Sequence, residues 1–286
     1  MMKKRTISCT AGISITAAIL FCSLTQLAGC SEKEQKYKPV ADLPGKYVLV
    51  FQDEFDGETL DTTVWGFHAP GKRRSAVNVR EACLLNGKGE LEIRNWTEIS
   101  ENDTVHHAGM IETRKDFAFG YYEARIKFNI REGSWGAFWI MYRNTGKTYG
   151  EKDNPRKDGT EIDIMEFVPL NGRYGCHNLH WNGYGEFIKS RGSGELMNGL
   201  LDDYHIYSLL WTRKGYIFYI DGQETWRSGE GVSHVPEYVI LSTEIQDGGW
   251  AGDIPESGYG SFGETENIMY VDYIRVFRVS SGYRAI

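Results

Sequence analysis

Short stretches in which every second residue is apolar follow one another along the chain from Tyr47 onward. Because successive side chains of a β-strand point to opposite faces, this alternation predicts strands. Most of the stretches are also rich in aromatic and β-branched residues, which favour strands. The predicted strands are Tyr47–Phe51, Glu90–Trp96, His107–Arg114, Gly120–Asn129, Trp135–Tyr142, Thr160–Val168, Gly175–Trp181, Tyr204–Thr212, Tyr216–Ile220, Glu224–Arg227, Tyr238–Ile245 and Met269–Val279. No convincing amphipathic helix accompanies them.

One connection carries a specific turn signal. Asp221-Gly222 lies between Tyr216–Ile220 and Glu224–Arg227, and Asp-Gly is strongly preferred in tight hairpin turns. A dozen strands in roughly 240 residues imply two packed sheets rather than one. We therefore predict an all-β fold, a one-domain β-sandwich.

The N-terminus has a different pattern. Lys3-Lys4-Arg5 precedes an apolar stretch from Ile13 to Leu24, and Leu27-Ala28-Gly29-Cys30 follows. This stretch is too short and wrongly flanked for a stable transmembrane helix. The arrangement resembles a bacterial lipoprotein signal, in which the cysteine is lipidated and becomes the first residue of the mature protein. The alternative is an ordinary secretory signal in which Cys30 is incidental.

The resemblance divides the chain into three parts. Residues 1–29 are expected to be a lipoprotein signal peptide, and 30–44, polar with two prolines, a flexible tether. Residues 45–286 form the predicted folded domain. A lipid on Cys30 implies a cell-envelope protein that contacts the membrane through its anchor.

Composition and charge narrow the range of partners. Of the 286 residues, 41% are hydrophobic and 25% charged, which is typical of a globular domain. The net charge of −7 becomes −10 once the three basic residues of the signal are removed. A net-acidic protein binds polyanions poorly, so nucleic acid and highly sulfated polymers are disfavoured unless a local basic patch overrides the net charge.

Two cysteines, Cys83 and Cys176, remain after the signal. They could form one disulfide in an oxidising compartment. Their separation and the lack of a spacing pattern favour two buried small hydrophobic side chains instead. The sequence contains no Cys/His metal cluster.

Three carboxylates lie within the predicted strand Thr160–Val168. Alternation places Glu161 and Asp163 on one face, whereas Glu166, an odd number of positions from Glu161, should point away. A one-residue bulge near Ile164-Met165 would return Glu166 to the face of the other two. With that bulge, the two glutamate carboxyls would lie about 5 Å apart, the separation of a retaining glycosidase.

A charged edge strand paired with lysines is the structural alternative for these acids. Ile162, Ile164 and Phe167, however, indicate that the other face of the strand is buried. Like charges clustered on such a strand are costly, which favours a catalytic function.

Glu161-Ile-Asp163-Ile-Met-Glu166 resembles the Glu-x-Asp-x-x-Glu signature of glycoside hydrolase family 16, in the bulged form of laminarinase-like members. Further segments from Tyr47 to Val279 resemble family blocks in family order: Phe51–Gly57 with Leu60-Asp61 and Trp65, Gly120–Lys127, Gly133–Met141, Leu179–Trp181, Trp211–Gly222 and Val271–Val276. The resemblance implies a jelly roll of the concanavalin A type with an open cleft. It also implies Glu161 as nucleophile, Glu166 as acid/base and Asp163 as the assisting residue.

Several residues are candidates for substrate binding. Trp135 and Trp139, four apart on one strand, should face the same side and could stack on sugar rings; core packing is the alternative. Glu244 and Trp250 belong to a segment that departs from the laminarinase pattern and could contact the substrate.

His180 could lie beside the catalytic strand and hydrogen-bond sugar hydroxyls, unless it is a satisfied buried histidine. His106, His107 and His177 are expected to be surface or loop residues. Glu54 and Asp272 resemble a place where many family members hold a structural calcium, but two carboxylates are too few without backbone carbonyls. No cofactor is required.

The main hypothesis is an endo-acting retaining β-glycosidase that hydrolyses internal β-1,3 or β-1,4 linkages of a neutral β-glucan or galactan-type polysaccharide. The first alternative is an endo-β-galactosidase acting on host, mucin-type glycans. The second is a surface glycan-binding protein without activity. We expect a monomer that binds no nucleic acid.

Overall fold

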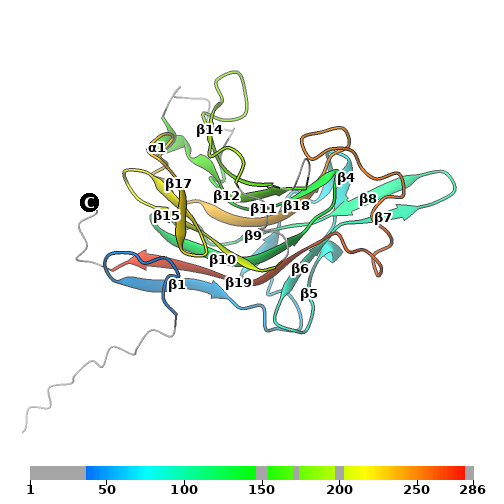
Figure 1. Ribbon diagram of the computed structural model, residues 1–286, viewed down its shortest axis with the longest axis horizontal. Coiled ribbons are helices and arrows are strands. Elements are labelled where there is room, and N and C mark those ends of the chain that lie inside the picture. Colours follow the sequence, from blue (N-terminus) through cyan, green and yellow to red (C-terminus); the bar gives the residue numbers. More distant parts are fainter. Residues whose placement is uncertain (1–36, 146–153, 170–173, 197–202, 281–286) are drawn as a thin grey trace, which may run out of the picture. The chain divides into compact units, whose positions relative to one another are not determined.

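Two antiparallel β-sheets form the layers of the fold (Figure 1). The computed structural model describes residues 37–145, 154–169, 174–196 and 203–280, all within a compact unit, Gln35–Ile286. Met1–Glu34, with the predicted signal and Cys30, lies outside the described residues. Within the described ranges no helix is long and apolar enough to cross a membrane.

In these ranges the first sheet has eight strands. Its order is β17 (Gln223–Ser228), β16 (Tyr216–Ile220), β15 (His205–Trp211), β10 (Gly120–Asn129), β19 (Ile268–Val279), β6 (Leu91–Arg94) and β5 (Cys83–Leu85), with β1 (Tyr47–Asp53) paired to β19. The seven-stranded second sheet has the order β14 (Lys189–Gly192), β13 (Tyr174–Trp181), β12 (Thr160–Val168), β11 (Ser134–Met141), β18 (Tyr238–Ile245), β9 (Met110–Thr113) and β2 (Trp65–Phe67).

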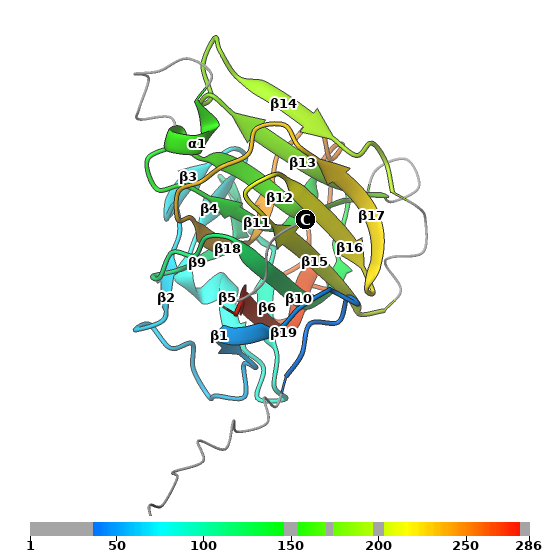
Figure 2. The same cartoon turned by 90° about the vertical axis from the view of Figure 1, so that its left-hand side faces the viewer.

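Smaller elements border these sheets. A sheet of four strands within the described residues has the order β3 (Gly71–Arg73), β4 (Ala76–Asn78), β8 (Thr104–Ala108) and β7 (Trp96–Ile99). Helix α1 (Pro155–Asp158) is one turn long and directly precedes β12, as Figure 2 shows, and Arg80–Ala82 forms a 3₁₀ turn. The prediction of an all-β sandwich is confirmed.

The core lies between the two large sheets. Phe128 of β10 and Phe167 of β12 stack with their ring centroids 5.3 Å apart, and Ile162 of β12 is fully buried in the same cluster. Burying a side chain of this size stabilises a fold by about 1.5–3 kcal/mol. Because β12 turns these residues inward, its other face is available for the polar residues of the site.

Most predicted strands are present with nearly the same bounds, and those over Gly120–Asn129 and Thr160–Val168 coincide with β10 and β12. The predicted strand Glu90–Trp96 is interrupted at Asn95, and His107–Arg114 at Gly109. At Gly109 a Cβ atom would lie 2.6 Å from the Cys83 sulfur, so this close approach needs a glycine. The short strands β2 to β5 and β14 were not predicted, because three or four residues carry too little periodicity.

The hairpin between β16 and β17 has the expected turn. Ile220 pairs with Gln223, and both residues between them have positive φ, 50° at Asp221 and 76° at Gly222. Such angles characterise the tight turn that matches the twist of a hairpin, and Asp-Gly tolerates them.

Residues 37–44 pack against the first sheet. The Val40 amide donates to Glu123 Oε2 at 3.0 Å, and the Ala41 amide donates to the Tyr121 hydroxyl at 3.2 Å. Ala41 is buried in a cluster with Tyr121. Residues 37–44 of the predicted tether (30–44) are therefore fixed to the domain. The rest of the tether, residues 30–36, lies outside the described residues.

Candidate active site

Strand β12 carries one residue more than its neighbours between Asp163 and Glu166. Across from it, β13 advances two residues, from Asn178 to Cys176, while β12 advances three. The pairing of β12 with β11 shifts at the same place. The additional residue turns Glu166 to the face that carries Glu161 and Asp163.

A cavity of about 310 Å³ lies over this face. It is lined by the three carboxylates Glu161, Asp163 and Glu166 and by His68, Arg73, Arg74, Trp135, Ala137, Trp139, Met141, Tyr184, Ser242 and Glu244. Among the residues predicted to bind substrate, Trp135, Trp139 and Glu244 are thus part of the lining. His180 and Trp250 are neighbours of lining residues.

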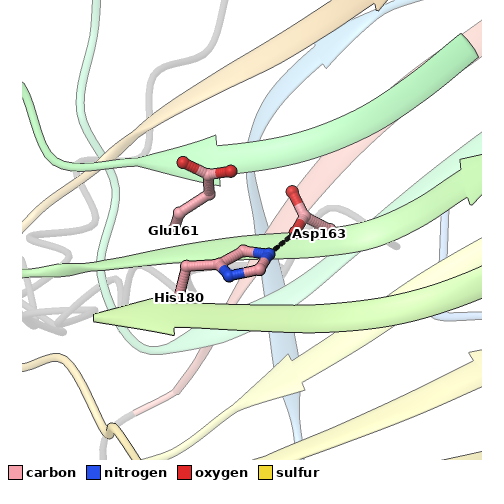
Figure 3. A group of neighbouring side chains, drawn as sticks. All are labelled: Glu161, Asp163 and His180. Atoms are coloured by element: carbon pink, nitrogen blue, oxygen red, sulfur yellow. Dashed lines mark ion pairs between the residues drawn. The ribbon is translucent and has the colours of Figure 1, made fainter. Parts of the chain in front are cut away.

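Figure 3 shows the ring of His180 directed toward Asp163, with Glu161 beside them. His180 Nε2 lies 3.5 Å from Asp163 Oδ2, too far for a good hydrogen bond, and its Nδ1 lies 2.6 Å from Ser190 Oγ. Asp163 Oδ2 is buried and has no hydrogen-bond partner among the described residues. A buried oxygen of this kind favours the protonated form of the carboxyl.

Burial and mutual repulsion disfavour the simultaneous ionisation of the three carboxyls. Burial raises the pKa of each one, and repulsion from Glu166 further raises the pKa of Glu161 and Asp163. Asn178 Nδ2 donates to Glu166 Oε2 at 2.8 Å and partly offsets the effect of burial on Glu166. The cluster therefore holds protons that can be transferred, as acid/base chemistry requires.

Two arginines from the β3–β4 hairpin reach the cavity. Arg73 donates to Glu244 through Nε at 3.0 Å and through a terminal nitrogen at 2.8 Å, and Arg74 Nε donates to the same carboxylate. Both guanidinium groups lower the pKa of Glu161 against the larger effect of burial. Glu244 was expected to contact substrate, whereas here its carboxylate is occupied by the arginine pair, Arg73 and Arg74.

The tryptophans have polar as well as apolar contacts. Trp139 Nε1 donates to Ser242 Oγ at 3.0 Å, and Trp135 meets the half-exposed Trp250 edge to face with centroids 5.8 Å apart. The Arg74 guanidinium lies 5.0 Å from the centre of the Trp135 ring. Trp135 and Trp139 thus share the cavity side of β11, and their rings are held in place before any ligand is bound.

The residues suggested for calcium do not fit that ion. Glu54 accepts two hydrogen bonds from Arg275, at 2.9 and 2.7 Å, and Asp272 accepts one from Arg125 at 2.7 Å. Each carboxylate is thus neutralised by a different arginine, and a guanidinium beside a calcium site would repel the ion. A calcium bound by Glu54 and Asp272 receives no support.

Of the three histidines expected at the surface or in loops, His177 lies in the core, and His106 and His107 lie half-buried on a strand. His106 and His107 belong to β8, and His107 stacks on Trp96 with ring centroids 4.5 Å apart. His177 of β13 is fully buried in the core. His177 lies three positions from His180, so strand alternation already places it on the opposite face. Cys83 and Cys176 are both free and buried, which agrees with the interpretation as small hydrophobic side chains.

A buried carboxylate fixes the start of β12. Glu237 is fully buried, and its Oε1 accepts a hydrogen bond from the Thr160 amide at 3.0 Å, directly before Glu161. Burial raises the pKa of Glu237 to about 8 from an ordinary 4.5. The folded chain therefore binds a proton that the unfolded chain releases above about pH 4.5, so the stability due to Glu237 is present at low pH and is lost as pH rises toward 8.

Glu237→Gln should remove this pH dependence. Glutamine keeps the carbonyl oxygen that accepts from Thr160 but cannot ionise. One pKa unit is worth about 1.4 kcal/mol, so the variant should melt several degrees above the unmodified protein near pH 9 and within about one degree of it near pH 4. Melting curves from pH 4 to 9 measure the difference. The exposed Glu256→Gln serves as the control, and parallel profiles for all three proteins would contradict the prediction.

Comparison with known proteins agrees with this geometry. Residues 46–279 match the sequence model of the family described as beta-porphyranase A–D, GH16 domain. The keratan-sulfate endo-1,4-beta-galactosidase of Sphingobacterium multivorum is 27% identical over 250 residues, which are 82% of this chain and 56% of that protein. Beta-porphyranase E of Zobellia galactanivorans is 28% identical over 251 residues, 79% of this chain and 85% of that protein.

The fold has a similar relative among solved structures. The crystal structure of porphyranase B from Zobellia galactanivorans superposes with a TM-score of 0.67 at 23% identity, covering 85% of this chain and 97% of that one. This chain spans about half of the galactosidase but most of both porphyranases. The family match extends over nearly the whole described domain. The chain belongs to glycoside hydrolase family 16 and is a glycoside hydrolase with a jelly-roll fold.

Proposed function

We propose that this chain hydrolyses internal β-glycosidic linkages of a polysaccharide by double displacement, with retention of configuration. The observation that carries the proposal is the irregularity of β12, which gathers Glu161, Asp163 and Glu166 on one wall of the cavity. Two carboxyls on one side of a short strand segment suit the nucleophile and acid/base of a retaining enzyme. An inverting enzyme needs a wider separation, because a water molecule must fit between its carboxyl and the sugar.

In the first step Glu166 donates its proton to the leaving oxygen while Glu161 attacks the anomeric carbon. Burial raises the pKa of Glu166, so that it holds this proton near neutral pH. Once Glu166 is neutral, its repulsion of Glu161 disappears, and the arginine pair favours the Glu161 carboxylate. In the second step Glu166 removes a proton from water, which attacks the glycosyl–enzyme ester and releases Glu161.

The stereochemistry tests this mechanism. We expect the first product formed from a β-linked polysaccharide to carry the β anomer, because two displacements at one carbon restore its configuration. Proton NMR during the first minutes, before mutarotation, measures the anomer ratio. An α anomer as the initial product would overturn the double-displacement mechanism.

A galactoside-containing glycan is the substrate class that we favour over a neutral β-glucan. The matched family and a relative are named for porphyran, and another relative for keratan sulfate. The arginine pair also places two guanidinium groups in the wall of the cavity, where both donate to Glu244. Reducing-end release from porphyran, keratan sulfate, mucin glycans, laminarin and mixed-linkage β-glucan distinguishes the two classes.

A glycan-binding protein without activity is the least favourable alternative. Such a protein gains nothing from three buried carboxyls whose ionisation is suppressed, and binding a neutral sugar requires none of them. The open side of the cavity and its two tryptophans suit an endo-acting enzyme that accepts the interior of a chain.

We also propose that Cys30 anchors the enzyme to the cell envelope, as the preceding Leu27-Ala28-Gly29 suggests. Cys30→Ser should leave an unprocessed precursor or release the protein from the membrane fraction, because the lipid chains of a lipoprotein provide the anchor. Fractionation and mass determination of the full chain measure both effects, with Cys22→Ser as the matched control. Unchanged processing and partitioning of the Cys30→Ser protein would refute the anchor.

A further inference from the structure

One buried histidine lies directly opposite the irregularity that shapes the catalytic strand. Asp163 pairs with Asn178 and Glu166 with Cys176, so His177 is the residue of β13 that faces the two intervening residues of β12. The pairing of β12 with both neighbouring strands passes over Ile164. A carbonyl at such a bulge turns out of the regular ladder and needs another donor if it is buried.

His177 supplies that donor. Its Nδ1 lies 2.5 Å from the Ile164 carbonyl oxygen, and its Nε2 lies 2.8 Å from Thr225 Oγ1. Because a carbonyl can only accept, Nδ1 carries the hydrogen. Burial lowers the pKa of His177 to about 4, so the ring is neutral and Nε2 accepts from the threonine hydroxyl.

The second contact of His177 is also made at an irregularity. Between β16 and β17, Phe218 pairs with Trp226 and Tyr219 with Glu224, so the pairing passes over Thr225. His177 therefore joins an irregular position of one sheet to an irregular position of the other through the core. Its ring stacks on Phe218 with centroids 4.7 Å apart, which fixes the ring plane.

We propose that His177 is a positioning residue for the acid/base. The Nδ1–H group fixes the peptide plane after Ile164, and that plane sets the direction in which Glu166, two residues later, points into the cavity. Packing alone does not require histidine, because a phenylalanine would fill the same stacked position. The inference rests on the roles proposed above for Glu161 and Glu166.

His177→Phe isolates the hydrogen bond. Phenylalanine keeps the stacked ring, and the Thr225 hydroxyl retains the Phe218 carbonyl, 3.2 Å away, as an acceptor. The Ile164 carbonyl alone loses its donor. His177→Asn places an amide nitrogen near the position of Nδ1, whereas His177→Gln places it near Nε2, so these variants form a matched pair with and without the bond to Ile164.

The readout is the dependence of kcat/KM on the leaving group. Each protein is assayed with the polysaccharide that it degrades best and with a 2,4-dinitrophenyl β-glycoside of the oligosaccharide released from that polymer. If the acid points in the wrong direction, hydrolysis of the polysaccharide slows, because its leaving oxygen needs a proton. Hydrolysis of the aryl glycoside is little affected, because dinitrophenolate leaves without one. We expect His177→Phe and His177→Gln to lose on the order of 10- to 100-fold on the polysaccharide and less than about threefold on the aryl substrate. His177→Asn should keep the ratio of the unmodified enzyme.

Two further variants distinguish an error in the role of His177 from an error in the proposed mechanism. Thr225→Val removes the other hydrogen bond of His177 and should lower the melting temperature without changing the substrate ratio. Glu166→Ala should show the leaving-group bias most strongly. Equal losses on both substrates in Glu166→Ala would overturn the assignment of the acid/base, and with it the proposed mechanism.

Glu166→Ala could lose more activity on the polysaccharide than on the aryl substrate while His177→Phe loses equally on both. That result would overturn only the role of His177. If His177→Phe does not fold, the Asn and Gln variants decide: equal substrate ratios in these two would overturn the proposal. The same bias in Thr225→Val as in His177→Gln would also overturn it, because the effect would not then depend on the bond to Ile164.

Discussion

Glu161→Ala should abolish hydrolysis of the polysaccharide almost completely. Without the carboxylate no glycosyl–enzyme ester can form, and loss of a catalytic nucleophile costs on the order of 10⁵-fold or more in kcat. The alanine also leaves space next to the anomeric carbon. Added azide should attack from this side in a single displacement and give an α-glycosyl azide, with inverted configuration, from an activated aryl β-glycoside.

Product configuration by NMR and rate against azide concentration measure this result. Glu256→Ala, an exposed acid outside the cavity, should retain full activity and show no azide product. An unchanged melting temperature of Glu161→Ala excludes a folding defect. A β-glycosyl azide from Glu161→Ala would mean that Glu161 is not the nucleophile.

Glu166→Ala should give the second-largest loss, and this loss should depend on the substrate. General acid catalysis contributes about 10²–10⁴-fold, so polysaccharide hydrolysis should fall by that factor. A substrate with a dinitrophenolate leaving group does not need the proton and should still form the ester with Glu161. Azide should then attack the ester and give a β-glycosyl azide, with retained configuration.

Two variants refine this test. Glu166→Gln should resemble the alanine variant with the polysaccharide, because the amide cannot transfer a proton, but should show less rescue by azide because the space remains filled. Asn178→Ala keeps the acid and removes only the amide that donates to Glu166, so its pH profile should shift toward higher pH. An α-glycosyl azide from Glu166→Ala would show that the two roles are exchanged.

The bulge in the catalytic strand was predictable because strict alternation would separate its three acidic residues onto two faces. Alternation places Glu166 on the wrong face of an otherwise regular strand, and the mismatch itself indicates where a bulge belongs. Thr160–Val168 also matches the observed strand, since Ile162, Ile164 and Phe167 recur over nine residues and give a strong signal. The long strands of both sheets were predictable for the same reason.

The arginine pair was not predictable by these means. Arg73 and Arg74 contact Glu244, which lies about 170 residues further along the chain. The hairpin that carries them consists of strands of three residues, too short to show a period. Only the local run Lys72-Arg73-Arg74 in an acidic chain gave a signal, and it does not reveal which residue it meets.

The role of His177 could be inferred only from the register of strand pairing, because the residue type does not reveal it. A histidine within a predicted strand, three positions from His180, belongs to the opposite face by alternation. Its partner, however, is a backbone carbonyl that is left without a strand partner only because the pairing register shifts at Ile164. Backbone groups freed by irregular pairing have no signature in the sequence, which is why the histidine was misplaced.

The docking of residues 37–44 also limits how far the enzyme can reach if Cys30 carries the lipid. The chain from that anchor to Tyr37 spans at most about 25 Å when fully extended, whereas a free segment from the anchor to Pro44 would span about 50 Å. An anchor at Cys30 would then keep the catalytic cavity close to the bilayer. Polymers would have to be delivered to the membrane surface, and the concentration of glycan at that surface, rather than in the medium, would set the rate of degradation.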